Sequence, residues 1–144
     1  MSKILKVILP LLAVTLIIYF PFLKKPGLLL EISKDLTEFF WPLIYFVKKE
    51  VLAGRGIPFW NPHILSGTPL LPDPQSPIFY LPNLIFLITP INTAFITSLF
   101  LHTFLGGLFF YLLLNSGFKF SNKSSLIGAL LYIASPKLAA YLEA

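Results

Sequence analysis

The stretch PFWNPHILSGTPLLPDPQSPIFYLP, residues 58–82, lies between two apolar runs that are long enough to cross a membrane. Seven of its twenty-five residues are proline. Each proline lacks a backbone N–H and restricts the residue before it, so this pattern predicts neither regular helix nor sheet. The stretch is nevertheless too rich in apolar and aromatic residues for a disordered linker. It therefore predicts a rigid, folded loop outside the membrane, a kind of segment that commonly carries function.

The composition of the chain indicates contact with lipid. Of its 144 residues, 56% are hydrophobic and 12% are charged, and the mean hydropathy is +0.82. Such a chain has too little polar surface to cover a soluble globule. The net charge of +5 comes from dispersed lysines beside the apolar runs, which excludes the clustered basic face of a nucleic-acid-binding protein. Cysteine is absent, so disulfides and thiolate metal sites are excluded as well.

The first predicted transmembrane helix covers residues 1–23. A helix rises about 1.5 Å per residue, so the apolar part of this segment spans roughly the 30 Å of a hydrocarbon core. Lys3 and Lys6 resemble the basic start of a signal peptide. No small-residue cleavage site follows the apolar run, however, which favours an uncleaved signal anchor over a cleaved signal peptide.

Two further transmembrane helices are predicted over residues 91–114 and 124–142. Pro90 suits the first turn of the former, in which His102 is the only acidic or basic residue and is expected in mid-membrane. Lys137 lies near the end of the latter, where its side chain can reach the interface. The predicted fold class is therefore all-α: a polytopic membrane protein with three transmembrane helices and a large extracytoplasmic loop bearing interfacial helices.

The distribution of lysines predicts the orientation. The cytoplasmic loop expected at residues 115–123 carries two lysines, as does the N-terminus. Both segments belong on one side of the membrane, and the positive-inside rule makes that side the cytoplasm. The Lys24-Lys25 pair opposes this orientation without outweighing it. Residues 24–90 then form the extracytoplasmic loop.

An amphipathic helix is predicted over residues 35–53 of this loop, because apolar side chains recur there at helical spacing. Asp35 and Glu38 have the spacing of a capping box at its start. Pro42 either kinks the helix or begins its regular part. A helix this apolar beside a membrane is expected to lie in the interface plane.

A proline-rich layer over residues 54–77 and a second interfacial helix over residues 78–88 complete the predicted loop. Prolines bound the second helix, which is too short to span a bilayer. The loop is thus expected to return to the membrane surface at both ends.

Several short motifs in this loop occur together in one bacterial family. They are Asp35, Gly54-Arg55, Pro58-x-Trp60-Asn61-Pro62, Gly67-Thr68-Pro69, Asp73-Pro74-Gln75 and Tyr80-x-Pro82-Asn83. Their combination resembles the first external loop of YfhO-like bacterial membrane proteins, which belong with the GT-C type of polytopic glycosyltransferases. The resemblance covers nearly the whole chain but only the start of the family's domain. It implies an N-terminal fragment of a multi-pass protein of the bacterial inner membrane.

The resemblance implies transfer of a sugar from a polyprenyl-phosphate-linked donor to a cell-envelope acceptor. Asp35 occupies the place of the family's catalytic base or metal-proximal carboxylate. A carboxylate can take the proton of the attacking hydroxyl, and the leaving phosphate needs positive charge or a divalent cation. Asp73 is a candidate second carboxylate, and both acids are candidate metal ligands because hard cations prefer oxygen. The implied partners are membrane lipid, the lipid-linked sugar and the remaining spans.

Four more residues are candidates for binding substrate: Gln75, Asn61, Trp60 and Arg55. Each also has a purely structural interpretation. The two amides can hydrogen-bond their own loop, the tryptophan can anchor the loop core, and the arginine can neutralise a helix end. His63 is interpreted as a surface residue rather than a base or ligand.

The alternative function is a non-catalytic membrane module that binds lipid or assists assembly of an envelope complex. A transporter fragment is less favoured, because the predicted spans carry few polar residues. The chain has no Gly-rich phosphate loop, no His-Glu-x-x-His and no Gly-x-Ser-x-Gly motif, which excludes the enzyme classes that depend on them.

Overall fold

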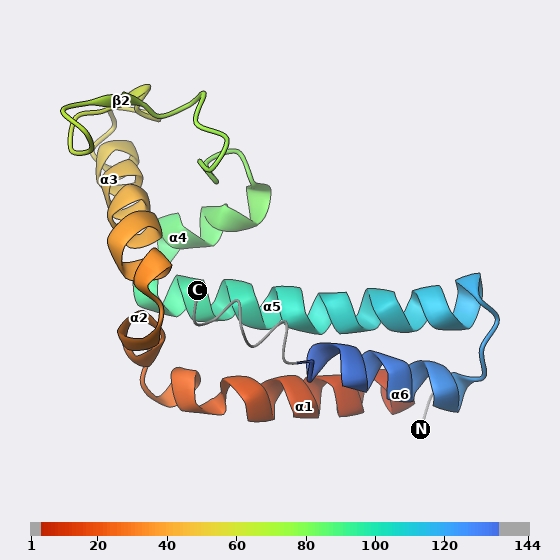
Figure 1. Cartoon of the computed structure of the whole chain (residues 1–144). Helices are drawn as coiled ribbons and strands as arrows, with labels where there is room; N and C mark the ends of the chain where they lie inside the picture. The colour runs from red at the N-terminus through yellow and green to blue at the C-terminus, as the bar shows by residue number, and fades with distance from the viewer. Residues whose placement is uncertain (1–3, 136–144) are drawn as a thin grey trace.

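The computed structural model describes residues 4–135, and these are mostly helical (Figure 1). Within this range, two helices are long and apolar enough to cross a membrane: α1 (Leu5–Lys24) and a continuous helix over Ile91–Gly117. The latter consists of α5 (Ile91–Leu112) and the π-helical turn η3 (Leu113–Gly117). The expectation of a mostly helical chain with membrane-length helices is thus confirmed.

A third helix, α6 (Asn122–Ile133), packs against both long helices, and the three form a bundle (Figure 1). Its first turn is capped by Ser121, whose Oγ accepts the N–H of Ser124 at 3.2 Å. The third transmembrane helix was predicted over residues 124–142. The part of that prediction from residue 136 onward, with Lys137, lies outside the described residues.

The three helices of the bundle meet at Gly107. A Cβ added there would lie 2.6 Å from Cγ2 of Ile133 and 3.4 Å from Cδ2 of Leu11. Leu11 and Ile133 are buried at this point together with Tyr111 and Ala129. A glycine allows the helix backbones to approach this closely, which is a packing device of membrane helices.

One hydrogen bond sets the relative depth of the antiparallel helices α1 and α5. The hydroxyls of Tyr19 and Thr103 lie 2.8 Å apart. His102, the neighbour of Thr103, therefore lies near the part of α1 that the Tyr19 side chain reaches. His102 lies near the middle of the Ile91–Gly117 helix, and its position in mid-membrane stays a prediction.

Residues 25–90 form a head at this end of the bundle. The head begins with α2 (Leu28–Ile32), a short helix that was not predicted. Next come the π-helical segment η1 (Leu36–Phe40) and α3 (Trp41–Leu52), where residues 35–53 were predicted to be helical. Pro42 lies in the first turn of α3, so it begins the regular helix rather than kinking it. In Figure 1, α3 runs roughly perpendicular to α1 and α5.

The predicted capping box is not formed. Asp35 itself has helical dihedral angles (φ −60°, ψ −40°), and its side chain makes no capping hydrogen bond. The N–H of Leu36 instead donates to Oγ of Ser33 at 3.4 Å, and Oγ1 of Thr37 donates to the Ser33 carbonyl at 3.0 Å. A capping residue must have a non-helical conformation. Asp35 is helical, so it cannot cap this helix.

The proline-rich stretch contains a short β-hairpin, which the prediction had excluded. β1 (Trp60–Asn61) pairs antiparallel with β2 (Thr68–Pro69). The proline in β2 removes one donor, and the next residue, Leu70, donates its N–H to the carbonyl of Phe59 at 2.8 Å. A proline is tolerated here because the ladder is only two residues long and has no further strand to bond.

The last part of the head turns back along α5. It consists of the 3₁₀ turn η2 (Leu81–Leu84) and α4 (Ile85–Ile88), where one helix over residues 78–88 was predicted. α4 packs against both α3 and α5. Just before η2, the hydroxyl of Tyr80 is hydrogen-bonded to Nε2 of His102. This bond ties the head to the middle of α5.

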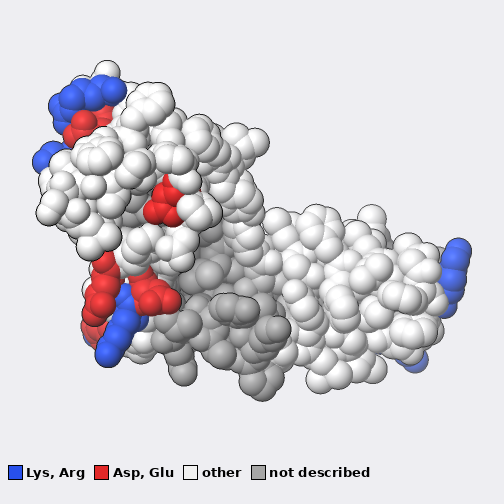
Figure 2. All heavy atoms as spheres, turned by 45° about the horizontal axis from the view of Figure 1, so that its top comes forward, with Lys and Arg blue, Asp and Glu red and all other residues white. Residues whose placement is uncertain are grey.

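Charged side chains gather at the two ends of the molecule and leave the visible flank of the bundle uncharged (Figure 2). At one end, Lys6 and Lys123 line the same surface hollow, so the two lysine-bearing segments lie together. The head carries every acidic residue of the described part of the chain: Glu31, Asp35, Glu38, Glu50 and Asp73. The uncharged flank is the surface that suits lipid.

Candidate functional site

Asp35 lies where the head joins the bundle, one residue before η1. Its carboxylate is exposed and forms no hydrogen bond or ion pair with any described residue. Glu31 in α2 differs, because Lys25 donates to its carboxylate at 2.7 Å. Asp35 therefore keeps both carboxylate oxygens available to a substrate.

Asp73 and Gln75 belong to one turn of the proline-rich stretch. Oδ1 of Asp73 accepts the N–H of Gln75 at 2.8 Å, and the Asp73 carbonyl accepts the N–H of Ser76 at 3.0 Å. This is an Asx turn, in which the aspartate side chain replaces a backbone acceptor. One carboxylate oxygen is thus committed to the loop, while the side chain of Gln75 is exposed.

Asn61 has a structural role in the hairpin. Its side chain is buried, and its Oδ1 accepts the N–H of His63 at 3.0 Å. The ring of His63 packs edge-on against Phe46 of α3, with the centroids 5.1 Å apart. Together these contacts hold the hairpin on α3, and the exposed histidine agrees with its interpretation as a surface residue.

Trp60 packs against Gly67, which comes just before β2 in the hairpin. Gly67 has a φ of +114°, and a Cβ there would lie 2.6 Å from the indole of Trp60. The indole therefore lies directly over the glycine backbone, which anchors the loop. One face stays accessible, since Trp60 is 53% exposed, so a sugar can still stack on it.

Arg55 follows the end of α3, where Gly54 adopts a φ of +75°. Its guanidinium makes two hydrogen bonds to the carboxylate of Glu50, from Nε at 2.7 Å and from Nη2 at 2.8 Å. These bonds hold the pKa of Glu50 below its ordinary value of 4.5 and raise the pKa of Arg55. Arg55 is thus neutralised locally and is a poor candidate for binding a substrate phosphate.

The fold does not bring the predicted site residues together. Asp35 precedes the helical segment that ends in α3, whereas the hairpin lies at the opposite end of α3 (Figure 1). Among the described residues, no group of three or more His, Asp or Glu side chains is placed to hold a metal ion. Since Asp73 is also committed to its own turn, Asp35 and Asp73 do not fit a shared divalent cation.

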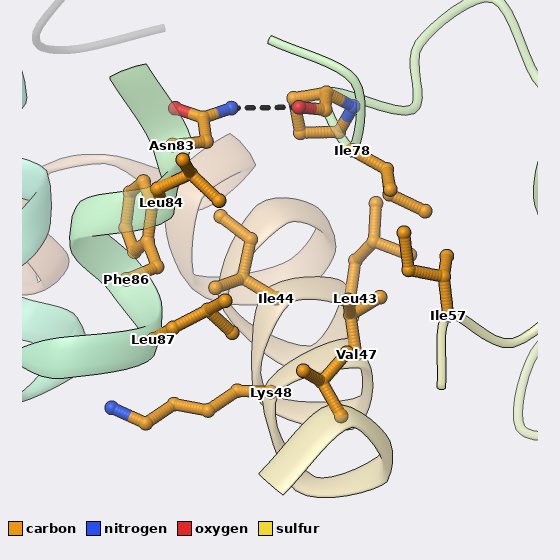
Figure 3. Close-up of a pocket in the computed structure, with 12 residues that line it drawn as sticks. Leu43, Ile44, Val47, Lys48, Ile57, Ile78, Asn83, Leu84, Phe86 and Leu87 are labelled. Carbon is orange, nitrogen blue, oxygen red and sulfur yellow. Dashed lines mark hydrogen bonds between the residues drawn. The ribbon is translucent and has the colours of Figure 1, made fainter. Parts of the chain in front are cut away.

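An apolar cavity of about 140 Å³ lies between α3 and the η2–α4 segment (Figure 3). Figure 3 shows Ile44 pointing toward Leu87 and Leu84 of that segment, whereas Leu43 points toward Ile57 and Ile78. The Asn83 amide closes one side by donating to the carbonyl of Pro77 at 2.8 Å. The aliphatic stem of Lys48 forms another edge.

A larger, open hollow of about 830 Å³ lies between α3 and the first turn of α5. Two lysines of α3, Lys48 and Lys49, line it, and sequence reasoning had not proposed either as a site residue. The signal in the sequence is a lysine pair that follows Trp41 and Tyr45 at helical spacing. It does not show what lies opposite those side chains, so it could not identify the hollow. We call this feature the lysine hollow.

The structure thus gives local partners to Asn61, Asp73 and Arg55 and leaves Asp35 free among the described residues. Comparison of the chain with protein-family models, with curated proteins and with solved structures finds no match. Function is therefore inferred from the geometry and chemistry of the head.

Proposed function

We propose that this chain acts in a membrane glycosyltransferase of the GT-C type, with Asp35 as the catalytic base. The observation that carries this proposal is the free, exposed Asp35 carboxylate at the junction of the apolar bundle and the polar head. A donor with a lipid tail and a hydrophilic acceptor meet at such a junction. The resemblance of the loop motifs to the YfhO-like family supports the same function.

In the proposed reaction, an acceptor hydroxyl attacks the anomeric carbon of the sugar on a polyprenyl-phosphate-linked donor. The bond from that carbon to the phosphate oxygen breaks, and its electron pair leaves with the lipid phosphate. The Asp35 carboxylate takes the proton of the attacking hydroxyl, which makes the oxygen a better nucleophile. The exposed face of Trp60 and the side chain of Gln75 are proposed contacts for the saccharide.

The proposed placement is a multi-pass protein of the bacterial inner membrane. α1 and the α5–η3 helix cross the bilayer, α6 begins a third span, and the head is extracytoplasmic. The positive-inside rule supports this orientation, because Lys6 and Lys123 share the far end of the bundle. Apolar side chains exposed on the segment beside α5 would contact the membrane surface: Phe79, Leu81, Leu84 and Ile88.

Substitution of Asp35 tests the catalytic role. We expect Asp35→Asn to lower sugar transfer by about 10²- to 10⁴-fold, because the amide cannot accept the hydroxyl proton. The assay follows labelled sugar from a polyprenyl-phosphate donor in membranes that contain the protein. Glu38→Gln, which removes another exposed carboxylate of the same segment, is the matched control and should retain activity. Wild-type turnover in Asp35→Asn would remove Asp35 from the mechanism.

The orientation is tested separately with single cysteines, since the chain has none of its own. Ser66→Cys in the hairpin should react with a membrane-impermeant thiol reagent in intact cells. Ser121→Cys, at the other end of the bundle, should react only after the membrane is opened. The reverse pattern would place the head in the cytoplasm.

The second candidate function is a non-catalytic lipid-binding module. It is favoured by the local structural roles of Asn61, Asp73 and Arg55, which leave few polar groups for a substrate. Retained membrane insertion with no transfer activity in the wild-type protein would support this module over the enzyme.

A further inference from the structure

The lysine hollow is formed by three segments of the head and bundle. One wall is α3, a second is the first turn of α5, and Pro26 closes the third side. Pro26 comes two residues after the end of α1 at Lys24. The hollow therefore opens where the apolar bundle ends, the level at which lipid headgroups surround a membrane protein.

The charged residues that line the lysine hollow are both lysines. Lys48 and Lys49 line it, and none of the acidic residues of the described chain does. The acid next to them in sequence, Glu50, lines a neighbouring hollow that Lys49 also borders, and its carboxylate is paired with Arg55. An open hollow with two ammonium groups and no carboxylate in its lining attracts anions.

The hydrogen-bond donors of the hollow are only partly used. Nζ of Lys48 donates to the carbonyl of Thr89 at 2.6 Å, which holds the ammonium group in place. Two of its three N–H protons remain available for other hydrogen bonds. Lys49 forms no hydrogen bond or ion pair with any described residue. Both lysines therefore have donors available to a bound anion.

Asn92 adds a neutral donor that is oriented by the protein. Its Oδ1 accepts the indole N–H of Trp41 at 2.9 Å, so its amide NH₂ is turned away from Trp41. No side chain caps the start of α5, whose first-turn residues line the same hollow, and a helix start carries partial positive charge. The Asn92 amide and this helix start add to the attraction of the two lysines for an anion.

The aromatic wall of the hollow suits the membrane interface. Trp41 and Tyr45 stack with their centroids 5.2 Å apart and their planes within 6° of parallel. Tryptophan and tyrosine are enriched at the level of lipid headgroups, where one part of the ring is apolar and the other is wet.

We propose that the lysine hollow binds the phosphate of an anionic phospholipid of the surrounding membrane. Lys48, Lys49 and Asn92 hold the phosphate, and Trp41 and Tyr45 lie beside the glycerol region. The apolar cavity between α3 and the η2–α4 segment is adjacent to the lysine hollow, because Lys48 lines both spaces. The bound lipid fixes α3 at the membrane surface. This role is independent of sugar transfer.

Native mass spectrometry of the detergent-purified full chain tests the proposal. Phosphatidylglycerol is titrated against phosphatidylcholine, which carries the same phosphate without net negative charge. We expect preferential retention of phosphatidylglycerol. Each lysine near a lipid surface contributes about a fivefold gain in binding, so Lys49→Gln should weaken retention about fivefold and the Lys48→Gln/Lys49→Gln pair about thirtyfold.

The control variant is Lys119→Gln/Lys123→Gln, which removes the same charge at the opposite end of the bundle and should leave binding unchanged. Lys49→Gln decides the result if the double variant misfolds, because Lys49 makes no bond to a described residue.

Equal binding of the two lipids, or unchanged binding in Lys49→Gln, would overturn the proposal. So would displacement of the lipid by millimolar inorganic phosphate, which would indicate a site for a free anion. Asp35→Asn should bind lipid normally, so failure of the catalytic proposal remains distinguishable.

Discussion

In the bundle, α1, α5 and α6 pack through apolar side chains and a glycine contact, whereas the head holds an irregular backbone through side-chain hydrogen bonds. Gly107 lets three helices meet in the bundle. In the head, Asn61 and Asp73 supply acceptors that a regular ladder would otherwise provide. The candidate site residues lie in the head and at its junction with the bundle, so the bundle serves as their support.

The same contrast appears in how far each contact extends. A contact in the bundle joins whole helices, so its loss should weaken the entire fold. A contact in the proline-rich stretch holds a few residues, so its loss should open one loop and leave the helices intact. The following three experiments test this difference.

The largest effect is expected from Gly107→Val. The new side chain would begin 2.6 Å from Ile133, a branched residue that has little freedom to move within a helix. We expect a loss of about 3 kcal/mol in the free energy of unfolding, the upper range for overpacking. The measurement is helix loss by circular dichroism as SDS is added to detergent micelles. Gly106→Val is the control, because its nearest contact is the movable ring of Tyr132 at 3.4 Å. Equal losses would show that the bundle is not closed at Gly107.

A smaller and local effect is expected from Gly67→Ala. Its φ of +114° is strained for alanine, and its Cβ would overlap the indole of Trp60. We expect the local stability of the hairpin to fall by about 2 kcal/mol, measured by hydrogen exchange at the N–H of Leu70. Gly54→Ala has a positive φ but no atom within 4 Å, so it should cost about 1 kcal/mol. A loss of helix in the bundle upon Gly67→Ala would contradict the independence of the two regions.

The smallest effect is the pH dependence of the end of α3. Hydrogen bonds from Arg55 hold the pKa of Glu50 below 4.5, so their contribution to stability is present above that pH. It is lost as the pH falls through the lowered pKa of Glu50. NMR titration of the Glu50 carboxyl should give a midpoint below 4.5 in the wild type and a higher one in Arg55→Gln. An unchanged midpoint in the variant would mean that the pair does not persist in solution.

Some features of the head could be predicted and others could not. Local residue chemistry accounts for the helix α3, for its end at Gly54 and for the Asx turn at Asp73. α2 and the β-hairpin were missed, since a five-residue helix and a two-residue ladder leave too short a pattern. The capping role given to Asp35 failed because the helix begins earlier than its apolar spacing indicates.

The sequence by itself determined the membrane-length helices, because apolar length and helical spacing are properties of consecutive residues. It also identified Asp35 as a candidate, through motifs that resemble a known family. Only the tertiary structure decided which polar groups remain free and where the lysine hollow lies. Lys48 contacts Thr89 across 41 residues of chain, and Trp41 contacts Asn92 across 51. Such pairings depend on how α3 folds back onto α5, and no local pattern of residues specifies that.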